Sequence, residues 1–374
     1  MNVMNLPIKR VTLFTVKVPV PFERINCPEF SHEPLNRGPT GGWDGEFFAN
    51  VPFYIVKVEG DGGPAGWADT NRLVNRQDLL SSMGRLIGMT PAQIRSDDME
   101  TWGTMPKGLH AASLDWSARM QDVPLWKLFG EKVRDGVLTA DWSGHRTPQG
   151  AAEMAKKAKA KGFHCLKLKA SMEQDTGGII AAIRDACGPD FHVVIDPNGR
   201  WETVEESVRR ARIMMDACPT SSQVEDAVYG KLGYEAMKKM REETGIFTIR
   251  TVTEEKGVRD CAEYGINGMN LNGRWPVLHR TSKLAHELGI PYWVGSAVES
   301  GIGDLTTIHF ALTQPAFTLS CELAGHMVRE HPMYDRPIVY RDGYSYPPEG
   351  PGLGANADEH AIAKYSIADP LVVE

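Results

Sequence analysis

The 374-residue sequence contains neither a long apolar run nor a long basic run. No stretch of about 18 uninterrupted apolar residues is present, so no membrane-spanning helix is expected. The segment 1–7 lacks the basic and apolar regions of a signal peptide. The formal net charge is −7, and no basic cluster indicates binding to nucleic acid or to an anionic membrane. We therefore expect a cytoplasmic protein.

Cysteine pairs are also missing. The six cysteines are scattered, and no two of them form a C-x-x-C pattern. This spacing argues against a structural zinc site and against a disulfide framework. Several of the cysteines lie inside apolar runs, where they are expected to be small core residues. They are Cys27, Cys165, Cys187, Cys218, Cys261 and Cys321.

The first third of the chain has the pattern of a small α+β domain. Strand-like segments cover 10–20 and 51–59, and helical patterns cover 78–87 and 109–120. The segment 22–50 between the two strands is rich in proline, glycine and aromatic residues. A loop of this length is usually functional or disordered, so we interpret it as a candidate lid; a passive loop is the alternative.

From about Gly136 onward, short apolar runs alternate with amphipathic helices. Eight such repeats are typical of a parallel (β/α)8 barrel. The predicted strands are Val137–Asp141, Cys165–Lys169, Val193–Asp196, Gln223–Glu225, Phe247–Thr251, Met269–Asn272, Tyr292–Ser296 and Phe317–Cys321. The predicted helices are Gln149–Lys161, Gly178–Cys187, Val204–Asp216, Tyr234–Thr244, Val258–Tyr264, Thr281–Leu288 and Leu305–Leu312.

These patterns predict two domains. An N-terminal α+β capping domain covers 1–135, and the (β/α)-barrel domain covers 136–330. The segment 331–374 is rich in proline and glycine and has no place in a closed barrel. We expect this tail to pack back on the cap.

The segment 163–170 alternates apolar and polar residues with the period of a strand. Lys167 and Lys169 therefore lie on one face of that strand. Two neighbouring ammonium groups repel, so each should make the other a better base unless carboxylates or a substrate anion lie opposite. A solvated edge strand with two lysines is the alternative interpretation.

Polar side chains follow the predicted strands at their carboxyl ends, where barrel enzymes carry their chemistry. Asp196 and Glu225 supply hard oxygen ligands of the kind Mg²⁺ prefers. A metal ion beside a bound carboxylate would stabilise the charge that appears when the adjacent carbon loses a proton. Lys169 is the candidate base, and Lys167 would help to hold the substrate carboxylate. The remaining strand ends offer Asn272, Ser296 and Glu299.

The sequence resembles the enolase superfamily and, within it, the mandelate racemase and muconate lactonizing enzymes, over nearly the whole chain. The motifs that carry this resemblance are Gly66-Trp67-Ala68-Asp69-Thr70, Ala112-Ser113-Leu114-Asp115-Trp116, Pro124 to Gly130, Lys167-x-Lys169, Val194 to Asn198, Val224-Glu225-Asp226, Val294 to Gly303 and Gly350 to Gly354.

The resemblance implies a cap built from both chain ends and a Mg²⁺ site at the barrel mouth. It implies Asp196 and Glu225 as the first two metal ligands and Lys169 as a general base beside Lys167. It places Glu299 near the substrate carboxylate, and Asn198 on the side that faces metal or substrate. Asn272 and Ser296 complete the expected substrate-binding set.

The sequence also departs from the family. The third metal ligand is an acid at the end of the fifth strand, where this chain has Thr251 or Val252. Glu254 or Glu255 would have to reach in from the following loop, or the guanidinium of Arg250 would lie near that place. With two acids and no third, affinity for Mg²⁺ should fall.

A second base is missing from the expected positions. The sixth strand ends with Asn272 where lactonizing-type members have a lysine, and the seventh has no histidine of the racemase type. A lone base suits syn β-elimination, so we expect a dehydratase acting on an acid sugar or a similar small carboxylate. A cycloisomerase or epimerase is the alternative, with His145, His326 or Arg274 as second base. A carboxylate-binding barrel with a degenerate or metal-free site, using Arg250 as its fixed cation, is a further alternative.

The resemblance implies a homo-oligomer, a dimer or an octamer. The expected partner is a small-molecule carboxylate substrate. The substrate's identity would be set by 22–50, by 71–77 and by strand ends such as Asp141-Trp142-Ser143.

Overall fold

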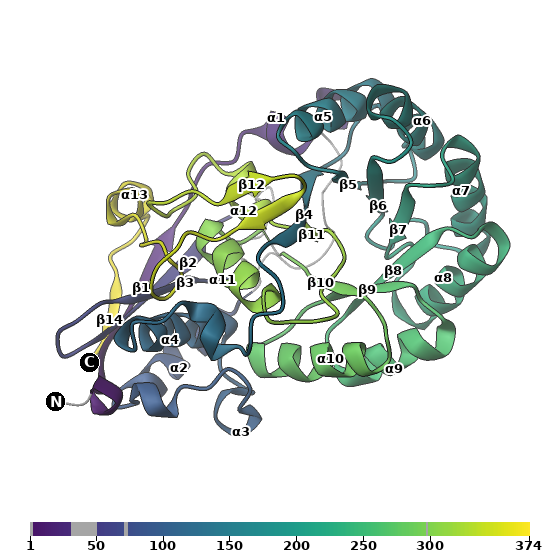
Figure 1. Cartoon of the computed structure of the whole chain (residues 1–374). Coiled ribbons are helices and arrows are strands. Elements are labelled where there is room, and N and C mark those ends of the chain that lie inside the picture. Colours follow the sequence, from purple (N-terminus) through teal and green to yellow (C-terminus); the bar gives the residue numbers. More distant parts are fainter. Residues whose placement is uncertain (1–2, 31–50, 71–73, 297) are drawn as a thin grey trace.

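The structure is a computed structural model that describes residues 3–30, 51–70, 74–296 and 298–374. A (β/α)8-type barrel lies beside an N-terminal capping domain (Figure 1). The predicted fold class is confirmed. Among the described residues, no helix combines the length and the apolar character needed to cross a membrane.

The barrel strands follow one another in chain order. From β4 to β10, each strand pairs in parallel with the next. The eighth strand, β11, pairs with β4. No ladder of the described residues joins β11 to β10, although Phe317 forms one bridge with Tyr292. The strands are β4 (Val137–Ser143), β5 (Cys165–Lys169), β6 (His192–Asp196), β7 (Ser222–Glu225), β8 (Phe247–Val252), β9 (Gly268–Leu271), β10 (Tyr292–Val294) and β11 (Cys321–Glu322).

The last predicted strand, Phe317–Cys321, is wrong for most of its length. The ladder with β4 contains only Cys321 and Glu322, and Phe317 forms an isolated bridge instead. An apolar run alone does not fix which residues pair, because pairing also depends on the partner strand. As a result, β11 ends at Glu322, one residue beyond the end of the predicted strand.

Some barrel helices begin where capping side chains satisfy free backbone N–H groups. Thr147 accepts a hydrogen bond from the N–H of Gly150 ahead of α5, and Thr203 accepts one from Glu206 ahead of α7. Several helices begin earlier than predicted, since residues such as Gly230 or the Trp275–Pro276 pair add a first turn without an apolar pattern. The helices are α5 (Pro148–Ala160), α6 (Thr176–Cys187), α7 (Val204–Ala217), α8 (Gly230–Thr244), α9 (Glu255–Tyr264), α10 (Trp275–Glu287), α11 (Gly301–Ala311) and α12 (Ala324–Val328).

The cap is a four-stranded antiparallel sheet in the order β14-β1-β2-β3, covered by α4. The short helices α1 (Phe22–Ile25) and α3 (Met99–Trp102) belong to its loops. The sheet and its main helices are β1 (Ile8–Val16), β2 (Phe53–Gly60), β3 (Gly66–Asp69), α2 (Arg76–Met83), α4 (Lys107–Met120) and β14 (Leu371–Val373). Of the candidate lid 22–50, the part from residue 31 onward lies outside the described residues.

The C-terminal tail contacts both domains. Its last strand, β14, pairs with β1 of the cap, and α13 (Glu359–Tyr365) packs near β1. The hairpin of β12 (Val339–Arg341) and β13 (Tyr344–Tyr346) instead pairs with barrel strand β4. The tail thus closes the cap sheet and also extends the barrel sheet.

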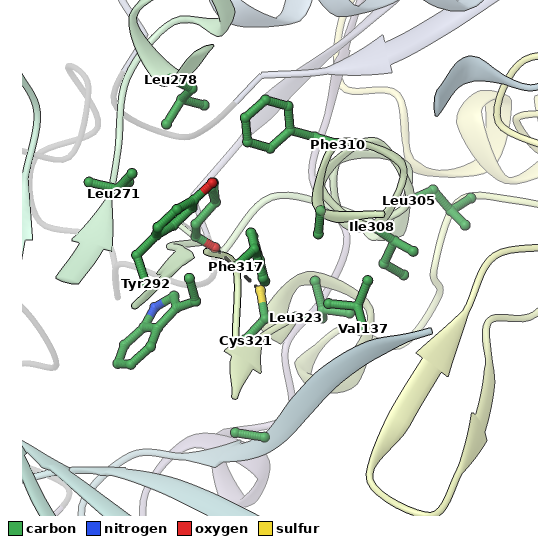
Figure 2. Packing of buried hydrophobic residues seen from close by; sticks show 14 of the residues in the cluster. Val137, Leu271, Leu278, Tyr292, Leu305, Ile308, Phe310, Phe317, Cys321 and Leu323 are labelled. Carbon is green, nitrogen blue, oxygen red and sulfur yellow. Dashed lines mark hydrogen bonds between the residues drawn. The ribbon is translucent and has the colours of Figure 1, made fainter. Parts of the chain in front are cut away.

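One apolar core continues from the cap into the barrel. Figure 2 shows its part between β9, β10, β11 and the helices α10 and α11, with Leu271, Tyr292 and Phe310 facing one another. The thiol of Cys321 donates to the carbonyl of Val294 at 3.4 Å. All six cysteines are buried and free. This packing fixes the strand ends that carry the polar residues described next.

Candidate active site

The carboxyl ends of the barrel strands and the facing edge of the cap line one cavity of about 1030 Å³. All eight side chains selected from the sequence line this cavity. They are Lys167, Lys169, Asp196, Asn198, Glu225, Asn272, Ser296 and Glu299. Their placement in one cavity agrees with the expected geometry, and their roles stay predictions.

Strand β5 places its two lysines on the same face, toward β6. The Nζ atoms of Lys167 and Lys169 lie 3.2 Å and 2.5 Å from the same oxygen, Oδ2 of Asp196. The side chain of Lys167 is only 2% exposed, whereas that of Lys169 is 12% exposed. Lys169 is therefore the amine more open to the cavity.

The ammonium group of Lys167 lies among three carboxylates. Its Nζ is 2.5 Å from Oε2 of Glu225, 2.9 Å from Oε1 of Glu322 and 3.2 Å from Oδ2 of Asp196. Burial alone would lower the pKa of Lys167, but Glu225, Glu322 and Asp196 outweigh it and hold that pKa well above the usual value. The sequence analysis allowed for carboxylates opposite the lysine pair, and the structure has them. Lys167 therefore stays charged.

Glu322 is a cavity residue that the sequence analysis did not select. It ends β11 and pairs in register with Ala140 of β4, so its carboxylate points to Lys167, 155 residues earlier in the chain. The signal was the acid directly after the predicted eighth strand. Extending that strand by one residue would have included it.

Asp196 and Glu225 use all four of their carboxylate oxygens within the protein. Asp196 accepts the backbone N–H of Asn198 on Oδ1, besides both lysines on Oδ2. Glu225 accepts the amide of Asn270 at 2.7 Å and the hydroxyl of Thr251 at 3.4 Å on Oε1, with Lys167 on Oε2. Both side chains are therefore held rigidly at the floor of the cavity.

The pKa values of these two acids diverge. Burial would raise the pKa of Asp196, but Lys169 and Lys167 hold it below its usual value. For Glu225, burial raises the pKa, and the nearby acids Asp196 and Glu322 add to this effect against the attraction of Lys167. The same cluster of charges thus shifts the pKa values of the two acids in opposite directions.

The donor set does not fit a Mg²⁺ ion as it stands. Asp196 and Glu225 have the hard oxygen atoms that Mg²⁺ prefers. However, the ammonium of Lys167 lies between them, and the neighbouring strand ends contribute Thr251 and Asn270. Among the described residues, no group of three His, Cys, Asp or Glu side chains is arranged to hold a metal ion.

The substitutes considered for the third ligand lie elsewhere. Glu254 occupies the N-cap position of α9, and Glu255 forms an ion pair with Arg280. Arg250 lines the cavity, but its Nη1 is bound to Oδ1 of Asp226 at 2.6 Å and to the carbonyl of Val228. The charge of Arg250 is thereby directed to Asp226, and Lys167 is the cation that contacts Asp196 and Glu225.

The expected substrate-binding residues form hydrogen-bonded pairs along the cavity wall. The hydroxyl of Ser296 donates to Oε2 of Glu299 at 2.8 Å. The amide of Asn272, just beyond β9, donates to Oδ1 of Asn270 at 3.1 Å, and both residues line the cavity. Asn198 has a left-handed backbone with φ 49°, which turns the chain directly after Asp196.

A buried carboxylate of the cap joins this wall. Asp69 ends β3 and accepts the backbone N–H of Ser300 at 2.5 Å, next to Glu299. Burial raises the pKa of Asp69 to about 7, the charge of Glu299 adds to this, and the hydrogen bonds from Ser300 oppose it. A Cβ atom at Gly303 would lie 2.5 Å from Oδ1 of Asp69, so glycine permits this close approach of cap and α11.

The three candidates for a second base have different positions. His326 lies between Asp304, 2.6 Å from its Nδ1, and the hydroxyl of Tyr340, 2.5 Å from its Nε2. His145 is buried beside Asn26, which accepts its backbone N–H. Neither histidine is among the described residues that line the cavity, whereas Arg274 is. The role of second base stays a prediction for all three residues, and only Arg274 lines the cavity.

Comparisons with known proteins identify the family. The enolase C-terminal domain-like family model matches residues 150–361, more than half of the chain. Muconate cycloisomerase 1 of Pseudomonas putida is 24% identical over 289 residues, which cover 74% of this chain and 75% of that protein. The D-galactonate dehydratase family member RspA of Cellvibrio japonicus is 23% identical, with coverage of 84% and 91%.

Solved structures agree with this assignment of the fold. The crystal structure of N-succinyl Arg/Lys racemase from Bacillus cereus has a TM-score of 0.78 at 19% sequence identity. The match covers 99% of this chain and 100% of that one. By their names, these relatives are a cycloisomerase, a member of the D-galactonate dehydratase family and a racemase. The chain therefore belongs to the enolase superfamily of enzymes, in its mandelate racemase and muconate lactonizing enzyme branch.

Proposed function

We propose that this protein removes the α-proton of a small hydroxy carboxylate with Lys169 as base and then eliminates water. The observation that carries the proposal is the position of Lys169. Its amine is the more exposed member of the lysine pair and lies at the carboxyl end of β5, inside the cavity. Asn272, Ser296 and Glu299 are the proposed contacts of the substrate's polar groups.

The composition of the cavity favours a single base. Among the described residues that line it, there is no histidine, and the lysines are Lys107, Lys167 and Lys169. Lys107 belongs to the cap, where its ammonium lies 4.7 Å from the centre of the Trp275 ring. Transfer of a proton between the two faces of one carbon requires a group on each face, whereas syn elimination requires one group only.

The proposed reaction balances without a further reactant. The ammonium of Lys169, which pairs with Asp196, first releases a proton to solvent. The neutral amine then takes the proton from Cα, and the electron pair moves into the carboxylate. The ammonium so formed returns the proton to the β-hydroxyl as the Cβ–O bond breaks. Water leaves. When the substrate is a 2,3-dihydroxy acid, the product is an enol that tautomerises to a 2-keto acid. Lys169 ends the cycle in its neutral form.

The test uses a panel of acid sugars and other hydroxy carboxylates in deuterium oxide, followed by proton NMR. Wild-type protein should exchange the α-proton of one panel member and form a keto acid. Lys169→Met should slow both by at least about 100-fold, since general bases contribute about that much. Lys156→Met, an exposed lysine on α5, is the matched control and should leave both rates unchanged. Persistent exchange in Lys169→Met would remove Lys169 from the role of base.

A cycloisomerase or epimerase is the second candidate. It is favoured by Asp69, a buried acid that lines the same cavity and has a pKa of about 7, so it could return a proton from another direction. The same NMR experiment separates the two reactions. Exchange with inversion or ring closure, and without release of a keto acid, would favour the isomerase.

Assembly into a homo-oligomer is part of the proposal, because the resemblance to the enolase superfamily implies it. Light scattering after size-exclusion chromatography tests it. A mass of 41.3 kDa would identify a monomer and contradict this part.

A further inference from the structure

The strongest unexplained feature of the cavity is the surrounding of Lys167. A lysine ammonium has three N–H donors and no acceptor. Three carboxylates lie within 3.2 Å of it, one each from β6, β7 and β11. The donors of Lys167 are therefore used within the protein, and its charge is fixed at one place.

The same place is the one where a metal ion would have to bind. A divalent ion between Asp196 and Glu225 would compete with Lys167 for Oδ2 of the first and Oε2 of the second. The other oxygens of these acids accept hydrogen bonds from Asn198, Asn270 and Thr251. A metal ion would also repel the ammonium group, because both carry positive charge in a buried place.

One further contact holds Lys167 in this position, besides the three carboxylates. Trp293, a buried residue of β10, presents its ring 5.4 Å from Nζ of Lys167. Glu322 contacts Lys167 from β11, which lies on the opposite side of β5 from Asp196 of β6 in the strand order. Strand ends on several sides of the barrel thus converge on one amine.

We propose that the ammonium of Lys167, held by Asp196, Glu225 and Glu322, is the resident cation of this site and takes the place of a divalent metal ion. Lys167 is a positioning residue that fixes three carboxylates and supplies constant positive charge at the cavity floor. The inference rests on the proposed function in one respect only, namely that the positive charge of Lys167 faces the carboxylate of the substrate during the reaction. Metal binding itself can be measured without a substrate.

The first test is metal binding by the full-length wild-type protein. The chain is treated with a chelator, freed of it by gel filtration, and titrated with MnCl₂ under electron paramagnetic resonance and with MgCl₂ in a calorimeter. No stoichiometric binding of either ion is expected. Binding of one ion per chain that Asp196→Asn abolishes would overturn the proposal.

The second test removes the resident cation. Lys167→Met leaves three carboxylates without their ammonium, so this variant should gain one Mn²⁺ per chain. Glu322→Gln in the same background should weaken that binding by at least about tenfold. Lys169→Met is the matched control, because it removes the other ammonium from Asp196 but leaves Lys167 in place. It should gain no metal site.

The outcomes divide clearly. Equal gain of metal in both lysine variants would contradict the special role of Lys167, as would a folded Lys167→Met that binds no ion. If Lys167→Met is insoluble, the wild-type titration decides alone. Proton exchange that requires added Mg²⁺ would overturn this inference and leave the proposed function intact. Absence of exchange in every condition would refute the proposed function, while the metal titration would still decide on Lys167.

Discussion

At the scale of single residues, the cavity depends most on Lys167. It is fully buried, and its charge is balanced by acids from three different strands. A buried ion pair contributes little compared with a well-packed apolar pair, but removing one partner leaves an uncompensated charge in the interior. The residue therefore matters for stability as well as for the proposed chemistry.

Lys167→Met should lower the free energy of unfolding by about 3–5 kcal/mol at neutral pH, the cost typical of a broken buried pair. The loss should shrink in acid, because protonation of the three carboxylates removes their need for a counter-charge. Urea unfolding at several pH values measures both effects. Lys156→Met should change stability by less than about 0.5 kcal/mol, as exposed substitutions usually do. An equal cost at pH 4 and pH 7 would contradict this account.

Asp69 gives a second prediction, on pH dependence. Its pKa is raised from 3.8 to about 7 in the folded protein, so between these values the folded state binds more protons than the unfolded one. The contribution is complete below pH 4 and is lost as pH rises to 7, by up to roughly 4 kcal/mol. Asp69→Asn keeps an oxygen for the N–H of Ser300 and should remove this slope. Unfolding curves at pH 4.5 and pH 7.5 test it, and an unchanged slope in the variant would contradict it.

At the scale of elements, the tail is fixed to the cap through a buried acid of α4. Asp115 accepts the backbone N–H groups of Trp67 and Leu353, each at 2.8 Å, and pairs with Arg119. It thereby joins β3, α4 and the segment that ends at Gly354. The chain comes so close that only glycine is tolerated at residue 352.

Gly352→Ala should destabilise the protein markedly more than Gly62→Ala. Both glycines have a left-handed backbone, with φ 63° and 81°, so both alanines carry a similar conformational cost of about 1 kcal/mol. At Gly352 the added Cβ would also lie 2.1 Å from Oδ1 of Asp115, whereas at Gly62 no atom of the described residues lies within 4 Å. Thermal unfolding of the two variants measures the difference. Equal melting temperatures would show that the contact with Asp115 yields at no cost.

At the scale of the whole molecule, cap and barrel share their apolar core. Domains with a common core are expected to unfold together. We predict one cooperative transition in urea, in which all six buried thiols become reactive toward a thiol reagent over the same range in which near-ultraviolet circular dichroism is lost. Labelling of the barrel thiols before the loss of the dichroism signal would indicate separate units.

The parts of the fold that could be predicted are those that depend on the sequence pattern of neighbouring residues. Apolar periodicity located seven of the eight barrel strands, and each predicted site residue stood at or near a strand end. Contacts between distant segments were not predictable in this way. Glu322 meets Lys167 across 155 residues, and Asp69 meets Ser300 across 231. Such pairs depend on register and on how the cap docks, which no local pattern states.

Strand β4 has a consequence for biosynthesis. It is the first barrel strand in the sequence. Besides β5, however, its pairing partners are β11 and the hairpin strand β13, both from beyond residue 320. While the ribosome is still translating, the backbone of β4 thus has exposed hydrogen-bonding groups that invite pairing with other chains. Protection of this edge comes only when Tyr346 has left the exit tunnel, so premature termination before that point should yield aggregating fragments.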